Sequence, residues 1–120
     1  MSLAVYKIIH FLGIIMLFMS LGGVLMVSIS GGEESRKSRK LLRINHGVGL
    51  LLILLGGFGM LARLGILWPL PGWVIAKILI WLMLGGLIAL VLQSDLSKLI
   101  WVMIILLGTV AAYLAIMKPF

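Results

Sequence analysis

Four long apolar stretches, separated by short polar or proline-containing segments, make up most of this chain. At 1.5 Å per residue, roughly 20 helical residues cross a hydrocarbon core of about 30 Å. The stretches reach this length, and the helices they predict cover residues 6–28, 45–64, 73–93 and 99–117. The pattern therefore predicts an all-α integral membrane protein, an antiparallel bundle of four transmembrane helices forming a single membrane domain over residues 1–120.

The connections between these helices are short. The polar run from Ser30 to Lys40 is predicted to be a loop outside the hydrocarbon. Pro69 and Pro71 stop helix propagation in the second connection, because proline has no amide hydrogen. The brief third connection predicts that the last two helices are antiparallel neighbours. Glycines near the middle of every span indicate close helix packing, or alternatively space for a flat ligand.

Composition excludes a soluble domain: 63% of the residues are hydrophobic and 11% are charged, whereas soluble domains carry about 25% charged residues. The net charge of +7 is ordinary for a membrane protein, so no nucleic-acid partner is expected. The expected partners are the lipid bilayer and anionic lipid headgroups at the basic loops. Because cysteine is absent, disulfides, thiolate nucleophiles and iron–sulfur ligands are excluded.

The basic residues predict the orientation. Six of them belong to the first and third connections, against four on the other side: the six are Arg36, Lys37, Arg39, Lys40, Arg43 and Lys98. Cytoplasmic segments carry the excess of Lys and Arg. We therefore expect both termini outside and loops 1 and 3 in the cytoplasm, in a bacterial inner membrane.

A cluster of cationic and polarizable residues is expected near the outer ends of the helices. Alternating helix directions place there Lys7, His10, Met60, Arg63, Lys77, Tyr113 and Met117. The predicted spans contain no Asp or Glu, which favours an anionic guest over a carboxylate-based proton relay. A porphyrin or quinone ring can use His10 or Met60 as a ligand while Lys7, Arg63 or Lys77 meets its carboxylates or ring carbonyl.

Each of these residues also has a simpler explanation. Lys7, Arg63 and Lys77 can extend to the interface, Met60 can fill packing gaps, and His10 can meet a headgroup. His46 stands at the predicted start of the second helix and hence at the opposite face of the bilayer. One heme therefore cannot easily use both His10 and His46 as axial ligands.

Two short segments resemble a known family. Tyr6–Gly13, with the sequence YKIIHFLG, looks like the first-helix motif of the HemJ-type protoporphyrinogen oxidases and the related CopD-like and SirB-like membrane proteins. Trp73–Lys77 looks like the start of a later HemJ helix that carries a hallmark Lys. The resemblance implies a four-helix bundle, heme b with its metal bound near His10, and Lys77 beside the tetrapyrrole. It also implies oxidoreductase activity.

Two functions of different classes follow from these observations. The first is a small membrane protein that binds heme or another tetrapyrrole in a redox role near the outer helix ends. The alternative is a non-catalytic accessory subunit of a larger membrane complex or a homo-oligomer. A transporter or channel ranks third because acidic residues are missing from the spans. Phosphate-binding, zinc-protease and dinucleotide-binding motifs are not found in the sequence.

Overall fold

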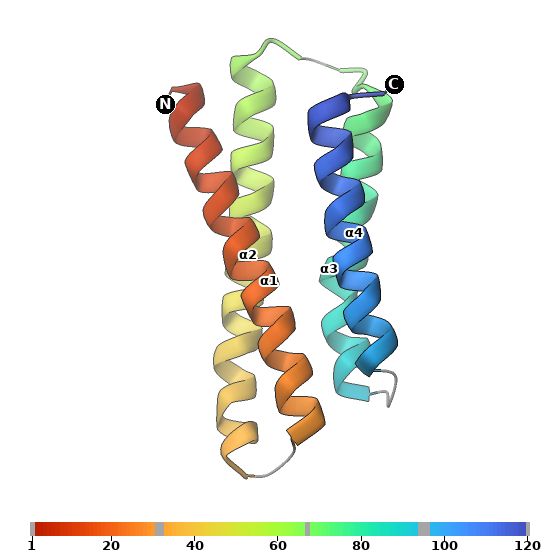
Figure 1. Ribbon diagram of the computed structural model, residues 1–120. Coiled ribbons are helices and arrows are strands. Elements are labelled where there is room, and N and C mark those ends of the chain that lie inside the picture. The colour runs from red at the N-terminus through yellow and green to blue at the C-terminus, as the bar shows by residue number, and fades with distance from the viewer. Residues whose placement is uncertain (1, 31–32, 67, 94–96, 120) are drawn as a thin grey trace.

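The computed structural model describes residues 2–30, 33–66, 68–93 and 97–119, and all the regular structure in these ranges is helical. The elements are α1 (Leu3–Ser30), α2 (Glu33–Arg63), α3 (Gly72–Gln93) and α4 (Ser97–Met117) (Figure 1). Each is long and apolar enough to cross a membrane. The prediction of four such helices is confirmed.

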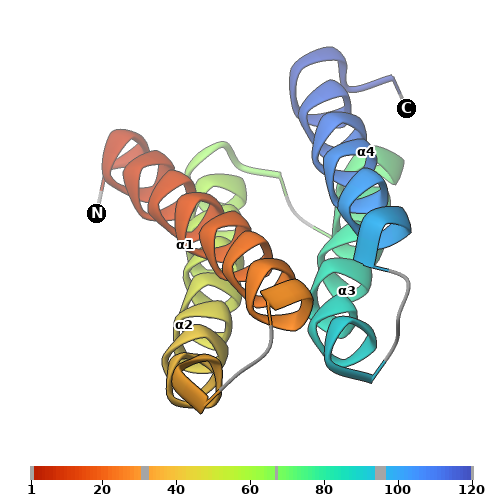
Figure 2. The same cartoon turned by 60° about the horizontal axis from the view of Figure 1, so that its bottom comes forward.

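Successive helices run in alternating directions (Figure 1). We call the end that holds the starts of α1 and α3 and the ends of α2 and α4 the terminal end, because both chain termini lie there. The opposite end is called the hairpin end. The α1–α2 and α3–α4 pairs diverge toward the terminal end, so α1 and α4 are farther apart there than at the hairpin end (Figures 1 and 2).

The start of α2 differs from the sequence prediction. The helix begins at Glu33, twelve residues before the predicted start near residue 45, so the prediction of a loop over residues 30–40 is wrong for residues 33–40. This segment is rich in Glu, Lys and Arg, which are good helix formers, and its two glutamates stand where the helix dipole favours negative charge. The other predicted helices agree with the structure within three residues. As a consequence, His46 lies well inside α2 instead of at its start.

The closest packing in the molecule joins α1 to α2 through glycine. A Cβ atom placed on Gly49 would lie 2.9 Å from the backbone N of Leu17 and 3.0 Å from the carbonyl O of Gly13. On Gly13 it would lie 2.6 Å from the backbone N of Ile53. The two helix backbones are thus in direct contact, as small residues allow in membrane bundles.

A polar network lies beside this contact. The Asn45 side-chain nitrogen donates to the carbonyl O of Met16 at 2.9 Å and to the Ser20 hydroxyl at 2.6 Å. The Ser20 hydroxyl donates to the same Met16 carbonyl at 2.7 Å. Since hydrocarbon offers no water, polar groups in a span must bond within the protein. Asn45 meets that demand by linking α2 to α1.

The α3–α4 pair joins the first pair mainly through α3. The Trp81 indole N–H donates to the Leu50 carbonyl at 3.0 Å, and Ser28 of α1 donates to the Val91 carbonyl at 3.2 Å. The core between the pairs is aliphatic, with Leu17, Leu21, Val24, Leu84, Leu87, Val91, Ile100 and Ile104 all buried. Within the described ranges, α4 contacts α1 and α3 but not α2.

Replacing Gly49 by Leu tests the backbone contact. The new side chain would meet backbone atoms of α1, which cannot rotate away, so we expect a loss of about 1–3 kcal/mol in unfolding free energy, typical of overpacking. The measurement is unfolding by SDS in mixed micelles, followed by circular dichroism. Gly47→Leu is the matched control, because a Cβ on Gly47 meets nothing within 4 Å. Equal stability of the two variants would contradict the close approach.

A double-mutant cycle tests the polar network. Asn45→Ala and Ser20→Ala should together cost less than the sum of the single changes, with a coupling of about 0.6–1.7 kcal/mol, the range for hydrogen bonds between membrane helices. The same SDS titration provides the free energies. Thr109→Ala is the control, because the Thr109 hydroxyl bonds within α4 to Ile105. Strictly additive losses would show that the Asn45–Ser20 bond does not contribute.

Candidate functional site

His10 is held in a slot that α2 provides. Its side chain is 9% exposed, and Nδ1 lies 2.9 Å from the carbonyl O of Ile53. A carbonyl only accepts, so Nδ1 carries the hydrogen and donates it. In the neutral ring the lone pair is therefore on Nε2, which is the atom left to bind a metal or accept a hydrogen bond.

Two glycines make this slot. Gly56 and Gly57 follow Ile53 by three and four residues, positions whose side chains would otherwise shield its carbonyl. A Cβ on Gly56 would lie 2.6 Å from the His10 backbone N, and one on Gly57 would lie 3.5 Å from Cε1 of the ring. The Gly56–Gly57 pair thus has a specific role, which the sequence prediction of general close packing did not identify.

Lys77 approaches His10 from α3. Its side chain is half-buried, and its charge acts on the His10 ring by repulsion of like charges. Trp81, one turn further along α3, is bonded to Leu50 of α2, and this bond fixes the face of α3 that meets α2. The predicted grouping of His10 with Lys77 at one end of the bundle therefore agrees with the structure.

Lys118 adds a second ammonium group. In the sequence, this residue counts only as one of the four basic residues on the outer side of the membrane. It interacts electrostatically with Lys77, and its Nζ lies 5.4 Å from the ring centroid of Trp73, within cation–π range. Lys118 has a positive φ of 46° and directly follows the last residue of α4. Pro119 disfavours helical backbone at the residue before it. The Lys-Pro pair was the sequence signal for this turn.

The other predicted site residues lie at the terminal end without converging on His10. Met60 is half-buried on α2, one turn beyond Gly56. The side chains of Lys7 and Arg63 are exposed, although Lys7 is only three residues from His10. Tyr113 and Met117 of α4 are also exposed, at 52% and 62%.

His46 forms a separate polar contact. It is 4% exposed, and its Nε2 donates to the Leu84 carbonyl at 3.3 Å, which links α2 to α3. His10 packs against Gly56, and the ten residues between His46 and Gly56 correspond to about 15 Å of helix. Metal–imidazole bonds are about 2 Å long, so one metal cannot bind both rings. The predicted separation of the two rings agrees with the structure, but His46 lies inside α2 and not at its start.

The chemistry available at the terminal end is one oriented imidazole with two ammonium groups, which come from α1, α3 and the end of α4. The described part of the chain holds no group of three His, Cys, Asp or Glu side chains suited to a metal ion by themselves. All three acidic residues, Glu33, Glu34 and Asp95, lie outside the candidate spans. The half-buried Lys77 needs an anionic partner, so the arrangement favours a ligand that carries negative charge and an atom for Nε2 of His10.

Comparison with known proteins adds no assignment. No protein-family model matches the sequence, and no curated protein or solved structure is significantly similar to it. The likeness of residues 6–13 and 73–77 to HemJ-type oxidases therefore stays a prediction, and the function has to be inferred from the geometry around His10 and Lys77.

Proposed function

We propose that the chain is an integral membrane protein whose four helices cross a bacterial inner membrane in antiparallel order. The hairpin end faces the cytoplasm, and both termini lie outside. The proposal is supported by four helices of spanning length, by their alternating directions (Figure 1), and by the six basic residues in the N-terminal parts of α2 and α4, at the hairpin end. A cytoplasmic location for that excess follows the positive-inside rule.

We further propose that the terminal end binds heme b or a related tetrapyrrole in a redox role. The observation that carries this proposal is that His10 both donates from Nδ1 to the Ile53 carbonyl and interacts electrostatically with Lys77. Metal-ligating histidines usually donate their second ring nitrogen to a carbonyl or carboxylate, which fixes the ring and directs the other nitrogen at the metal. Lys77 and Lys118 supply positive charge for the propionate groups, and bound heme supplies one-electron chemistry.

The other predicted site residues have secondary roles in the proposed heme site. Met60 lies one turn from Gly56 and is the nearest candidate for a second, softer ligand on α2. Lys7 and Arg63 are exposed and are assigned to contact with headgroups or with the ligand's outer edge.

A non-catalytic subunit of a larger membrane complex, or of a homo-oligomer, is the second candidate. The arrangement of α4 favours it, because this helix lies at the edge of the bundle. Apolar residues remain exposed along its length: Leu99, Trp101, Val102, Ile105, Leu106, Val110, Ile116 and Met117. A neighbouring membrane helix or lipid covers such a face equally well.

Absorbance spectroscopy tests heme binding. Purified protein titrated with hemin in detergent should develop a Soret band that shifts on reduction, because a single imidazole ligates the iron. His10→Ala should lose the band, whereas His46→Ala should keep it, since the two rings lie about 15 Å apart along the bundle. Circular dichroism checks that both variants remain helical. A band that persists in His10→Ala removes His10 as ligand, and no band with the unmodified protein leaves the subunit function.

Modified hemin tests the role of Lys77. Lys77→Gln should weaken hemin binding about tenfold or more, since hydrogen bonds to charged groups contribute roughly 1.5–3 kcal/mol. The dimethyl ester of hemin lacks free carboxylates and should bind the protein and Lys77→Gln alike. Lys40→Gln, at an exposed position of α2 near the hairpin end, is the control. Equal weakening for hemin and its ester would contradict a carboxylate contact at Lys77.

A further inference from the structure

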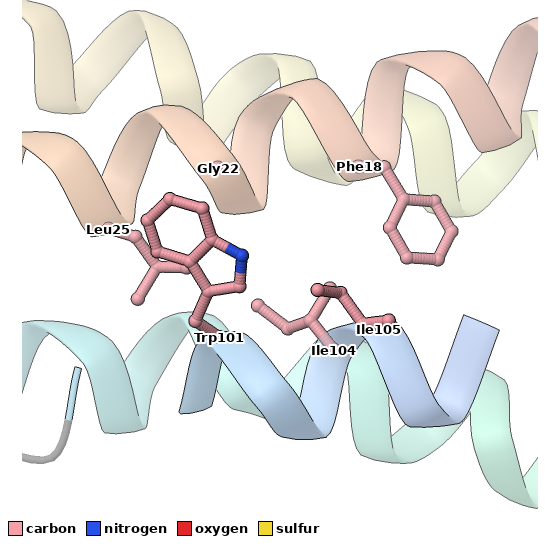
Figure 3. A pocket seen from close by; sticks show the side chains of 6 residues that line it. All are labelled: Phe18, Gly22, Leu25, Trp101, Ile104 and Ile105. Atoms are coloured by element: carbon pink, nitrogen blue, oxygen red, sulfur yellow. The ribbon is translucent and has the colours of Figure 1, made fainter. Parts of the chain in front are cut away.

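A second candidate site lies between α1 and α4, nearer the hairpin end. It is a groove of about 180 Å³ lined by Phe18, Gly22, Leu25, Trp101, Ile104 and Ile105 (Figure 3). Gly22 is twelve residues beyond His10, or about 18 Å along α1. The groove is therefore distinct from the His10–Lys77 site, and no residue of the proposed heme site lines it.

The groove exists because residue 22 has no side chain. A Cβ on Gly22 meets nothing within 4 Å, in contrast to the tightly packed Gly49. The Phe18 ring lies against Gly108, where an added Cβ would come within 3.0 Å of Cζ, and it closes the groove toward the terminal end. Leu25 is buried at 3% exposure and forms a fixed wall. The result is an apolar groove whose exposed rim includes Trp101 and Ile105.

The charged and polar groups near this groove lie toward its hairpin end. Lys98 precedes Trp101 by three residues in the first turns of α4, so the two lie on the same side of the helix. The Lys98 side chain is exposed at the hairpin end. The same end of the bundle holds Arg39, Lys40 and Arg43 of α2. Figure 3 shows the Trp101 indole reaching across the groove toward Gly22, and tryptophan is typical of the level where lipid headgroups meet acyl chains.

We propose that this groove binds one acyl chain of an anionic phospholipid from the leaflet at the hairpin end. The chain lies between Gly22 and Ile104, the phosphate meets Lys98, and the Trp101 N–H donates to an ester carbonyl. The apolar lining suits a hydrocarbon chain, and the basic residues of this end select a negative headgroup. The proposal rests on the membrane insertion proposed above but not on tetrapyrrole binding.

Quenching of Trp101 fluorescence by brominated lipid tests the proposal. The protein is placed in phosphatidylcholine vesicles with 10 mol % of brominated phosphatidylglycerol or of brominated phosphatidylcholine, and Trp101 emission is obtained by subtracting that of Trp101→Phe. We expect several-fold stronger quenching by the brominated phosphatidylglycerol. Lys98→Gln should reduce this preference about fivefold, since one basic residue near an anionic surface is worth about that factor in binding.

Filling the groove with a side chain distinguishes a specific lipid site from the general contact of a membrane helix with lipid. Gly22→Leu should abolish the preference for phosphatidylglycerol, whereas Gly86→Leu should retain it, because Gly86 of α3 also has nothing within 4 Å of an added Cβ. Both variants should keep their helix content and the hemin response of the unmodified protein. Equal quenching by the two brominated lipids, or an unchanged preference in Gly22→Leu, overturns the proposal.

The other tryptophans distinguish failure of the groove from failure of membrane insertion. Trp68, at 82% exposure, and the half-buried Trp73 lie at the terminal end. If neither these residues nor Trp101 are quenched by either lipid, the chain does not enter the bilayer. That result overturns both the proposed membrane insertion and the proposed lipid site. If only Trp101 escapes quenching, another protein surface, such as a second copy of the chain, fills the groove and the lipid site is wrong.

Discussion

The structure depends on one constraint, which is that α1 and α2 touch through their backbones. Gly13 and Gly49 bring the helices so close that carbonyl groups of one come within reach of side chains of the other. A helical carbonyl already accepts one bond from its own helix but has a second lone pair. Asn45 and His10 each donate to such a carbonyl of the opposite helix. Close backbone packing therefore also satisfies and orients the polar side chains.

Donation from a side chain to a carbonyl of a neighbouring helix also fixes α3 against α2, and both histidines make such a bond. Trp81 and His46 link α2 and α3 through carbonyls of Leu50 and Leu84, so these side chains act as structural contacts. His10 makes the same kind of bond but lies beside Lys77, in a part of the bundle that carries positive charge. A bond to a carbonyl alone therefore does not mark a ligand, and the ammonium groups near His10 are what separate it from His46.

The number of spans and the grouping of His10 with Lys77 were predictable, because apolar length and alternating direction determine both. The packing faces were not. In a helix that is apolar on all sides, periodicity does not reveal the buried face, and a glycine gives the same signal whether it contacts a neighbour, as Gly49 does, or open space, as Gly22 does. The helical start of α2 was missed because charged residues were equated with a loop. The position of Lys118 beside Trp73 depends on tertiary contact.

The proposed sites differ in how firmly their walls are held, and α4 belongs to both. It provides Trp101 to the groove, and it is followed directly by Lys118, which interacts electrostatically with Lys77. Helix α1 is fixed to α2 by backbone contact and hydrogen bonds, whereas α4 meets only α1 and α3 within the described ranges. An acyl chain between Gly22 and Ile104 would add apolar contact between α1 and α4. Because a helix moves largely as a unit, a lipid bound there would also restrain the position of Lys118, and would in that way connect the two proposed sites without direct contact between their ligands.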